Sequence, residues 1–144
     1  MKIRNITEND IPQMMELIKN CEHLHFERAG IYWFFWKFFR DTCFVAVENE
    51  KIIGLLMGII SQSDPKEAYI YNLGVLLDHR RKGIGSGLID HFCKKVKEKG
   101  CEFITLTTLV DNEYAIKYYQ KMGFEKPIKI EKVGIPRILF KKKI

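Results

Sequence analysis

The chain has 144 residues, a length that suits one domain with a hydrophobic core of its own. Hydrophobic residues make up 47% of it and no segment is low in complexity, which excludes a disordered or fibrous protein. The net charge of +6 favours an anionic partner only weakly, because much of it lies in the tail "FKKKI" and in "KKVKEKG", which is typical of a solvated helix face. No compact basic and aromatic motif is present, so we expect no nucleic-acid partner.

The cysteines and the N-terminus indicate the compartment. The four cysteines show no C-x-x-C spacing, and we expect small core residues rather than disulfides or metal ligands. The opening "MKIRNITEND" lacks the apolar centre of a signal peptide, and charges interrupt the longest apolar stretch. We therefore expect a cytoplasmic protein with one domain over 1–144, no membrane segment and no metal.

The first half of the chain alternates between strand and helix patterns. Residues 1–7 alternate as a strand does, and 8–21 place Ile11, Met14 and Ile18 at helical spacing after a cap at Asn9 or Asp10. A polar loop, an aromatic helix over 31–40, and two β-branched strands follow. The strands are joined around Asn49-Glu50, which indicates a hairpin.

The second half contains one strand–helix–strand unit and ends in a strand. The predicted elements are a strand over 68–77, a helix over 85–100, a strand over 101–109, a helix over 111–123 and a last strand over 133–143. The crossover from 68 to 108 predicts a parallel pair of strands. In the last strand, Pro136 indicates a bulge or an edge. The fold class is therefore mixed α/β.

The stretch "HRRKGIGSGL", residues 79–88, combines glycines with cations at the start of a helix. Unpaired backbone N–H groups and the helix dipole make such a terminus a site for phosphate. Glycines let an anion come close to the backbone. The pattern is not G-x-x-x-x-G-K-[ST], and from Gly83 the third glycine of G-x-G-x-x-G is replaced by Leu88. We predict a cradle for a pyrophosphate; the alternative is a glycine-rich helix start with solvated cations.

Two motifs in this half resemble the GNAT superfamily of acyl-CoA-dependent N-acyltransferases. Arg80-x-x-Gly83-x-Gly85 fits that family's R/Q-x-x-G-x-G/A signature, with a leucine-x-valine upstream at Leu73 and Val75. Downstream, "DNEYAIKYYQKMGF" resembles the family's second helix motif, at Asn112, Ala115, Tyr119, Gly123 and Phe124. Leu77 stands where the family usually has a proline, a departure that affects only the turn.

The resemblance implies a fold and an activity. The expected fold is GNAT-like: a central, mostly antiparallel twisted sheet of six or seven strands with a splayed parallel pair, flanked by about four helices. The expected activity is transfer of an acetyl group from acetyl-CoA to a primary amine by direct attack in a ternary complex. The acceptor is then a small-molecule or peptide amine, and a homodimer is possible from family habit.

The resemblance also implies a donor site. Backbone groups of Leu73 and Val75 bond the pantetheine arm and the thioester, and Gly74 between them is the expected bulge residue. The remaining cofactor-binding residues are those of the cradle and its cations, together with an asparagine on the later helix: Arg80, Arg81, Lys82, Gly83, Ile84, Gly85, Ser86, Gly87 and Asn112. Asn112 has an alternative role as a helix cap.

Tyr119 is the expected general acid. A phenol with a pKa near ~10 can protonate a departing thiolate whose pKa is near ~8.5. Tyr119 lies seven residues after Asn112, so both face one side of the helix. Tyr118 faces about 100° away and is expected in the core. The alternative for Tyr119 is a packed core tyrosine.

The base and the acceptor wall are less defined. The family's strand glutamate is missing here, and we expect a water chain ordered by Glu67 or Tyr71 as the catalytic route for the amine proton. The family walls its acceptor site with the segment after the first helix, which here offers Glu22, His23, His25, Glu27, Tyr32, Trp33 and Trp36. The alternative for the aromatic residues is core or dimer surface.

Three other functions stay open. Within the fold, a different acyl group would be used if the pocket were deeper. A non-catalytic CoA-binding regulatory domain would keep the cradle and need no Tyr119. A nucleotide-binding module with unrelated chemistry is the third.

Overall fold

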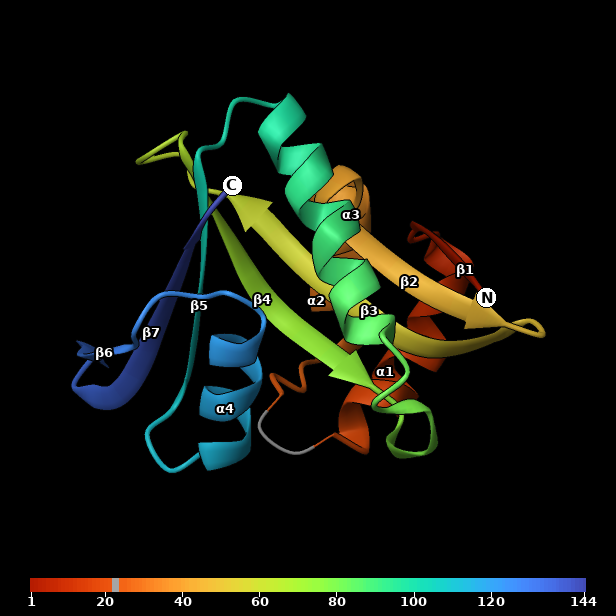
Figure 1. The fold of residues 1–144 in the computed structure, drawn as a ribbon. Helices are drawn as coiled ribbons and strands as arrows, with labels where there is room; N and C mark the ends of the chain where they lie inside the picture. The colour runs from red at the N-terminus through yellow and green to blue at the C-terminus, as the bar shows by residue number, and fades with distance from the viewer. Residues whose placement is uncertain (22–23) are drawn as a thin grey trace.

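A computed structural model describes residues 1–21 and 24–144 and contains one mixed sheet with helices on both faces (Figure 1). The sheet order is β1-β2-β3-β4-β5-β7-β6. Its strands are β1 (Lys2–Asn5), β2 (Cys43–Glu48), β3 (Lys51–Ile60), β4 (Glu67–Val75), β5 (Phe103–Leu109), β6 (Ile128–Lys132) and β7 (Ile135–Lys143). The helices are α1 (Ile11–Lys19), α2 (Ala29–Phe39), α3 (Ile84–Glu98) and α4 (Glu113–Lys121). Among the strands of the described residues, β4 and β5 form the one parallel pair, so the predicted fold class is confirmed.

Two hydrophobic clusters, one on each face of the sheet, hold the layers together. Apolar residues at helical spacing on α1 and α2, such as Met14 and Tyr32, pack on one face. Those of α3 and α4, such as Phe92 and Tyr119, pack on the other. Figure 1 shows α3 and α4 on the near side of the sheet and α1 and α2 behind it. The two faces of β4 therefore meet different helices.

The hairpin predicted at Asn49-Glu50 is confirmed, and a second hairpin was not predicted. Asn49 and Glu50 both have positive φ, at 50° and 65°, which matches the twist of the flanking strands. At the C-terminus, Val133 and Gly134 make a similar turn, with φ of 51° and 78°, and add β6 to the sheet. Pro136 pairs with β6 and precedes the first residue of β7 that pairs with β5.

The parallel strands β4 and β5 stay together only at one end. Their paired residues run from Glu67 to Tyr69 on β4 and from Phe103 to Thr105 on β5. Beyond this point the strands separate, while β4 continues along β3 and β5 continues along β7. This separation makes β4 and β5 the splayed parallel pair that the family resemblance implied.

The bulge in β4 lies at Tyr71, so the prediction of a bulge at Gly74 was wrong. Met57 pairs with Asn72 and Gly58 with Ile70, which leaves Tyr71 as the extra residue. Gly74 pairs with Leu55 in regular register. A glycine is required at this position because of packing: a Cβ at Gly74 would lie 2.7 Å from Leu24 Cδ1.

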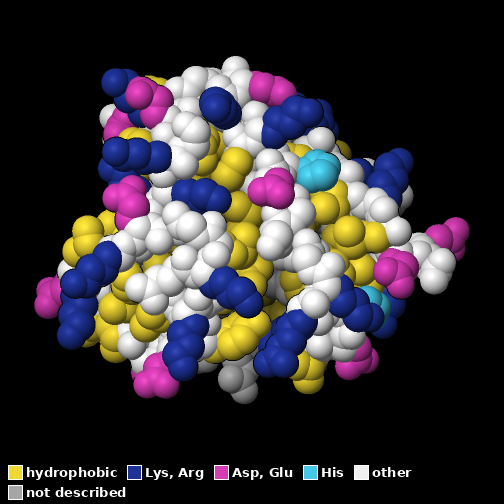
Figure 2. Space-filling view, in the orientation of Figure 1, with side chains coloured by type: hydrophobic (Ala, Val, Ile, Leu, Met, Phe, Trp, Pro, Cys, Tyr) yellow, Lys and Arg dark blue, Asp and Glu magenta, His cyan; other side chains and the backbone are white. Residues whose placement is uncertain are grey.

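Surface and cysteine properties agree with the composition. Figure 2 shows Lys and Arg side chains spread over the whole visible face, with Asp, Glu and hydrophobic surface between them, and no single basic patch there. The four cysteines are free, and three of them are buried. In the two described ranges, the helices are all too short or too polar to span a bilayer.

Candidate functional site

A cleft of about 1490 Å³ opens where β4 and β5 separate. Pockets for drug-sized ligands have about 300–1,000 Å³, so this cleft has room for a large ligand and a second molecule. Its walls come from the end of α1, the loop before α2, β4, the start of α3, β5 and α4. Of the predicted site residues, the cleft brings together Tyr71, Leu73, Gly74, Val75, Arg80, Arg81, Gly83, Ile84, Gly85, Ser86, Asn112 and Tyr119. Glu67, Lys82 and Gly87 are not among its lining residues.

The start of α3 forms one end of the cleft. Gly83 is its N-cap and has φ of +79°, a conformation that favours glycine. The first intrahelical bond runs from Gly87 N–H to the Gly83 carbonyl, so the N–H groups of Ile84, Gly85 and Ser86 precede the helical ladder. These donors, the helix dipole and the adjacent Arg81 are the features by which helix N-termini attract anions.

Each glycine of the stretch has a different physical reason. A Cβ at Gly83 would meet nothing within 4 Å, so this position needs glycine for its φ alone. A Cβ at Gly85 would collide with the hydroxyl of Tyr118. A Cβ at Gly87 would lie 3.0 Å from Ile3 Cδ1 on β1, so Gly87 allows α3 to pack against the sheet.

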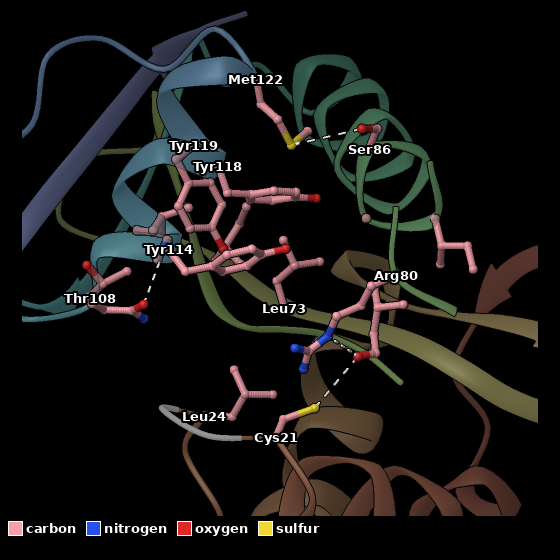
Figure 3. Close-up of a pocket in the computed structure, with 18 of the residues that line it drawn as sticks. Cys21, Leu24, Leu73, Arg80, Ser86, Thr108, Tyr114, Tyr118, Tyr119 and Met122 are labelled. Carbon is pink, nitrogen blue, oxygen red and sulfur yellow. Dashed lines mark hydrogen bonds between the residues drawn. The ribbon is translucent and has the colours of Figure 1, made fainter. Parts of the chain in front are cut away.

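Arg80 folds back onto the end of β4. Its Nε donates to the Val75 carbonyl at 3.1 Å, and Cys21 Sγ lies 4.0 Å from the same oxygen (Figure 3). Burial raises the pKa of the Cys21 thiol, and the Arg80 charge partly offsets this. Arg80 thus positions the loop between β4 and α3 while its charge stays in the cleft.

The backbone of β4 faces the cleft at alternate residues. Leu76 N–H bonds to Ile53 on β3 at 2.9 Å, so the strand alternation turns the N–H and carbonyl groups of Leu73 and Val75 toward the opposite edge. That edge has lost β5 as a partner. The main chain of Leu73 and the N–H of Val75 therefore face the gap, where an extended ligand could pair with them, whereas the Val75 carbonyl already accepts from Arg80 Nε.

Three tyrosines of α4 point into the cleft, and Asn112 begins the helix. In Figure 3 the rings of Tyr114, Tyr118 and Tyr119 lie between α4 and Leu73, with Tyr118 reaching toward α3. Tyr119 is 8% exposed and packs on Phe124 and Phe140, with ring centroids 5.3 Å away in each case. Tyr119 is thus part of the core, as the alternative expected, and burial raises its pKa above that of an exposed phenol.

Asn112 and Tyr118 each have two contacts, one that stabilises the fold and one with the cleft. The Asn112 side chain accepts a hydrogen bond from Ala115 N–H at 3.2 Å, so it caps α4 as well as lining the cleft. Tyr118 packs against the core cluster as expected, while its hydroxyl contacts the mouth of α3 at Gly85. The i, i+4 spacing of Tyr114 and Tyr118 could have indicated that both side chains lie on one face of α4, where their rings stack with centroids 6.1 Å apart.

The other end of the cleft is built from side chains. Tyr71 Oη donates to Glu27 Oε1 at 2.8 Å, and its ring stacks on His25 at 4.4 Å. Burial, followed by the bond to Glu27, raises the pKa of Tyr71. Asn72 fixes this segment, since its side chain bonds both His25 N–H and the His25 carbonyl. The Glu27–Tyr71 pair was not predicted as a unit.

Glu67 lies apart from this end. Its carboxylate accepts a hydrogen bond from Thr105 at the paired end of β4 and β5. The next polar pair along the same strands is Tyr69 Oη and Thr107 Oγ1, 2.9 Å apart. Thr107 lines the cleft and Glu67 does not.

The predicted acceptor wall is only partly placed at the cleft. His25 lines it. Tyr32 is fully buried and holds the loop, because its hydroxyl accepts from Glu27 N–H at 2.8 Å and donates to the His25 carbonyl at 3.2 Å. Trp33 is 42% exposed on the outer side of α2, and neither it nor Trp36 lines the cleft. Glu22 and His23 lie outside the described residues.

Comparisons with known proteins agree with this geometry. The sequence model of the acetyltransferase (GNAT) family matches residues 11–124. An uncharacterized N-acetyltransferase of Methanocaldococcus jannaschii is 30% identical over 135 residues, covering 85% of this chain and 60% of that protein.

Two solved structures share the fold. Naa20 of Chaetomium thermophilum, solved with a bisubstrate analogue, matches with a TM-score of 0.88 at 19% identity, covering 100% of this chain and 87% of that one. The diaminobutyrate acetyltransferase of Paenibacillus lautus, solved with L-2,4-diaminobutyric acid and coenzyme A, matches with a TM-score of 0.80 at 20% identity, covering 97% and 92%.

The chain therefore belongs to the GNAT family of acetyltransferases. It spans about three-fifths of the length of the archaeal relative.

Proposed function

We propose that this chain is an N-acetyltransferase that moves an acetyl group from acetyl-CoA to a primary amine by direct attack in a ternary complex. The observation that carries the proposal is the cleft itself. One end offers backbone N–H groups for a diphosphate, and β4 joins it to the other end, where Tyr71 lines the cleft and bonds the carboxylate of Glu27, which lies outside the lining. The four free cysteines agree with a reducing compartment such as the cytoplasm.

The residues at the α3 end fit coenzyme A. The diphosphate would be held by the N–H groups from Gly83 to Ser86, with Arg81 adding positive charge. Leu73 and Val75 would bond the pantetheine amides through their main chain, and Tyr118 would donate its hydroxyl near Gly85. When bound, acetyl-CoA supplies the thioester carbonyl that the amine attacks, and coenzyme A leaves as a thiolate.

Tyr119 would be the general acid. Its hydroxyl is protonated, which is the state that a proton donor to a thiolate needs, but burial raises its pKa and so makes it a weaker acid than an exposed phenol. Its ring is fixed between Phe124 and Phe140, so the hydroxyl position is set before any ligand binds. A backbone N–H of β4 aimed at the carbonyl oxygen would stabilise the charge that develops there.

The amine proton would leave through the Glu27–Tyr71 pair. A protonated alkylamine has a pKa near ~10.4, so the acceptor must lose a proton before it attacks. Tyr71 alone does not act as a base, because its pKa is raised, but it connects the cleft to the Glu27 carboxylate. Neither Glu27 nor Glu67 lines the cleft, but Glu27 is bonded to the lining residue Tyr71, whereas Glu67 is bonded to Thr105, which does not line the cleft, so the route through Glu67 would require ordered water.

The direct test is turnover. The protein is incubated with acetyl-CoA and a panel of amines, and free thiol release is followed together with the mass of the amine. We expect release that depends on one class of amine. Binding of coenzyme A with no turnover of any amine would overturn the proposal and favour the alternative, a non-catalytic CoA-binding regulatory domain.

A further inference from the structure

Two cations from the C-terminal hairpin approach the acceptor end of the cleft. Lys132 lies at the end of β6 and Arg137 near the start of β7, and both contact the Tyr69–Thr107 pair. Lys132 Nζ is 3.3 Å from Tyr69 Oη and lies over its ring at 5.4 Å. Arg137 Nη2 donates to the carbonyl and to Oγ1 of Thr107, at 3.2 Å in each case.

The contacts found for these cations in the described part of the chain are with neutral groups. The ion pairs found there are Arg4–Asp10, Lys66–Glu102, Lys95–Glu98 and Lys99–Asp41. Arg137 is half-buried, and its Nε is fully shielded from solvent without a hydrogen-bond partner in residues 1–21 and 24–144. A shielded guanidinium donor without a partner costs free energy, and a nearby anion would offset part of that cost through its charge.

The opposite wall carries the negative charge. The pKa of His25 responds to charges of both signs. Burial lowers it most, the positive charges of Arg137 and Lys132 lower it further, and the negative charge of Glu27 raises it. His25, Tyr71 and Thr107 line the cleft, and the charged groups stand one contact behind them: Glu27 bonds Tyr71, and Lys132 and Arg137 contact Thr107. An amine that carried only positive charge would be repelled by one of these walls.

We propose that Lys132 and Arg137 bind a carboxylate of the acceptor, so that the amine acetylated here belongs to a molecule that also carries a carboxylate a few atoms away. This inference rests on the proposed function and narrows its substrate class. The guanidinium of Arg137 suits the planar carboxylate, and Lys132 adds a point charge. The Glu27–Tyr71 pair then receives the amine. Free amino acids and peptides with an acidic N-terminal residue share this chemistry.

The test compares matched acceptors that differ in one charge. The first arm uses L-2,4-diaminobutyrate against its α-carboxamide, and the second uses the amidated peptides Glu-Ala-Ala-Ala and Gln-Ala-Ala-Ala. We expect the wild-type protein to prefer the acidic member by about tenfold or more in kcat/KM in one arm, and the arm identifies the source of the carboxylate.

Variants of Lys132 and Arg137 then test whether the β6–β7 hairpin causes the preference for the acidic acceptor. Arg137→Gln should reduce it to about two- to threefold, mainly by raising KM for the acidic member, and Lys132→Gln should reduce it less. Arg137→Lys should retain part of it because the charge remains. Lys129→Gln is the matched control: it removes the same charge from β6, but Lys129 pairs with Ile138, which faces the α3 and α4 layer.

The outcomes separate this inference from the proposed function. Acetylation of neutral amines with no preference for the acidic member in either arm would overturn the inference and leave the proposed function standing. An equal loss for both members in Arg137→Gln would also overturn it. If no amine is acetylated, the proposed function fails. Calorimetric binding of the same acceptor pairs to the protein with coenzyme A then decides whether the carboxylate is recognised.

Discussion

The two ends of the cleft are built from different parts of the chain. The α3 end uses main-chain groups of one continuous segment, Arg80 to Ser86, and its glycines are explained by φ and by close contacts. At the opposite end, side chains of distant segments meet: Tyr71 on β4 lines the cleft and bonds Glu27 before α2, and Arg137 on β7 bonds the lining Thr107. A backbone site serves a ligand part that does not vary, while a side-chain site can be changed without disturbing the fold. We therefore expect the donor to be shared with relatives and the acceptor to be particular to this chain.

The largest expected effect is at the backbone end. Gly85→Asp places a Cβ against the Tyr118 hydroxyl and a negative charge at the mouth of α3, so affinity for coenzyme A should fall on the order of a hundredfold or more. Calorimetry measures the Kd, and circular dichroism checks that the variant folds. Gly30→Asp is the control, because a Cβ there meets nothing within 4 Å. Unchanged affinity in Gly85→Asp would contradict the cradle.

The next effect separates two adjacent tyrosines. Tyr119→Phe removes the proposed proton donor and should lower kcat by roughly ten- to a thousandfold with little change in affinity for coenzyme A. Tyr118→Phe removes a hydroxyl at the α3 mouth and should weaken that affinity with a smaller effect on kcat. Steady-state kinetics with calorimetry distinguishes the two. The opposite pattern would exchange their roles.

A smaller effect compares two carboxylates. Glu27→Gln should lower kcat/KM by about tenfold at unchanged affinity for coenzyme A, because Tyr71 loses its carboxylate partner. Glu67→Gln should lose less, because Glu67 bonds Thr105 outside the cleft. Both variants are measured over a range of pH with one amine. A larger loss in Glu67→Gln would support the water route instead.

The smallest effect is a shift in one titration. The pKa of His25 is lowered by burial first and then by Arg137 and Lys132, and a positive neighbour disfavours the charged imidazole. Arg137→Gln should therefore raise the pKa of His25, whereas Lys129→Gln should leave it where it is. Nuclear magnetic resonance titration of the histidine ring protons measures this. No change in Arg137→Gln would mean that its guanidinium does not face His25.

The same contrast explains what could be predicted from sequence. The fold class, the parallel pair and the Asn49-Glu50 hairpin follow from local patterns and are confirmed. The placement of Gly83 as a left-handed cap agrees with the glycine pattern, because both belong to one short segment. The bulge at Tyr71 was missed because it depends on how β4 aligns with β3, which no local pattern encodes.

The side-chain end was beyond sequence reasoning for a related reason. Tyr71 and Glu27 are 44 residues apart, and Arg137 reaches Thr107 across 30 residues. β6 itself was missed, since Val133-Gly134 did not stand out as a turn, and with it Lys132 was left unassigned. Contacts of this kind arise only when the sheet has assembled.

The most direct test of the central claim is a crystal structure with coenzyme A. The diphosphate should lie within hydrogen-bond distance of the main-chain N–H groups between Gly83 and Ser86, and the pantetheine arm should follow β4 into the gap beside β5. Phosphates bound at any other place on the molecule, or a pantetheine arm outside the gap, would contradict the account.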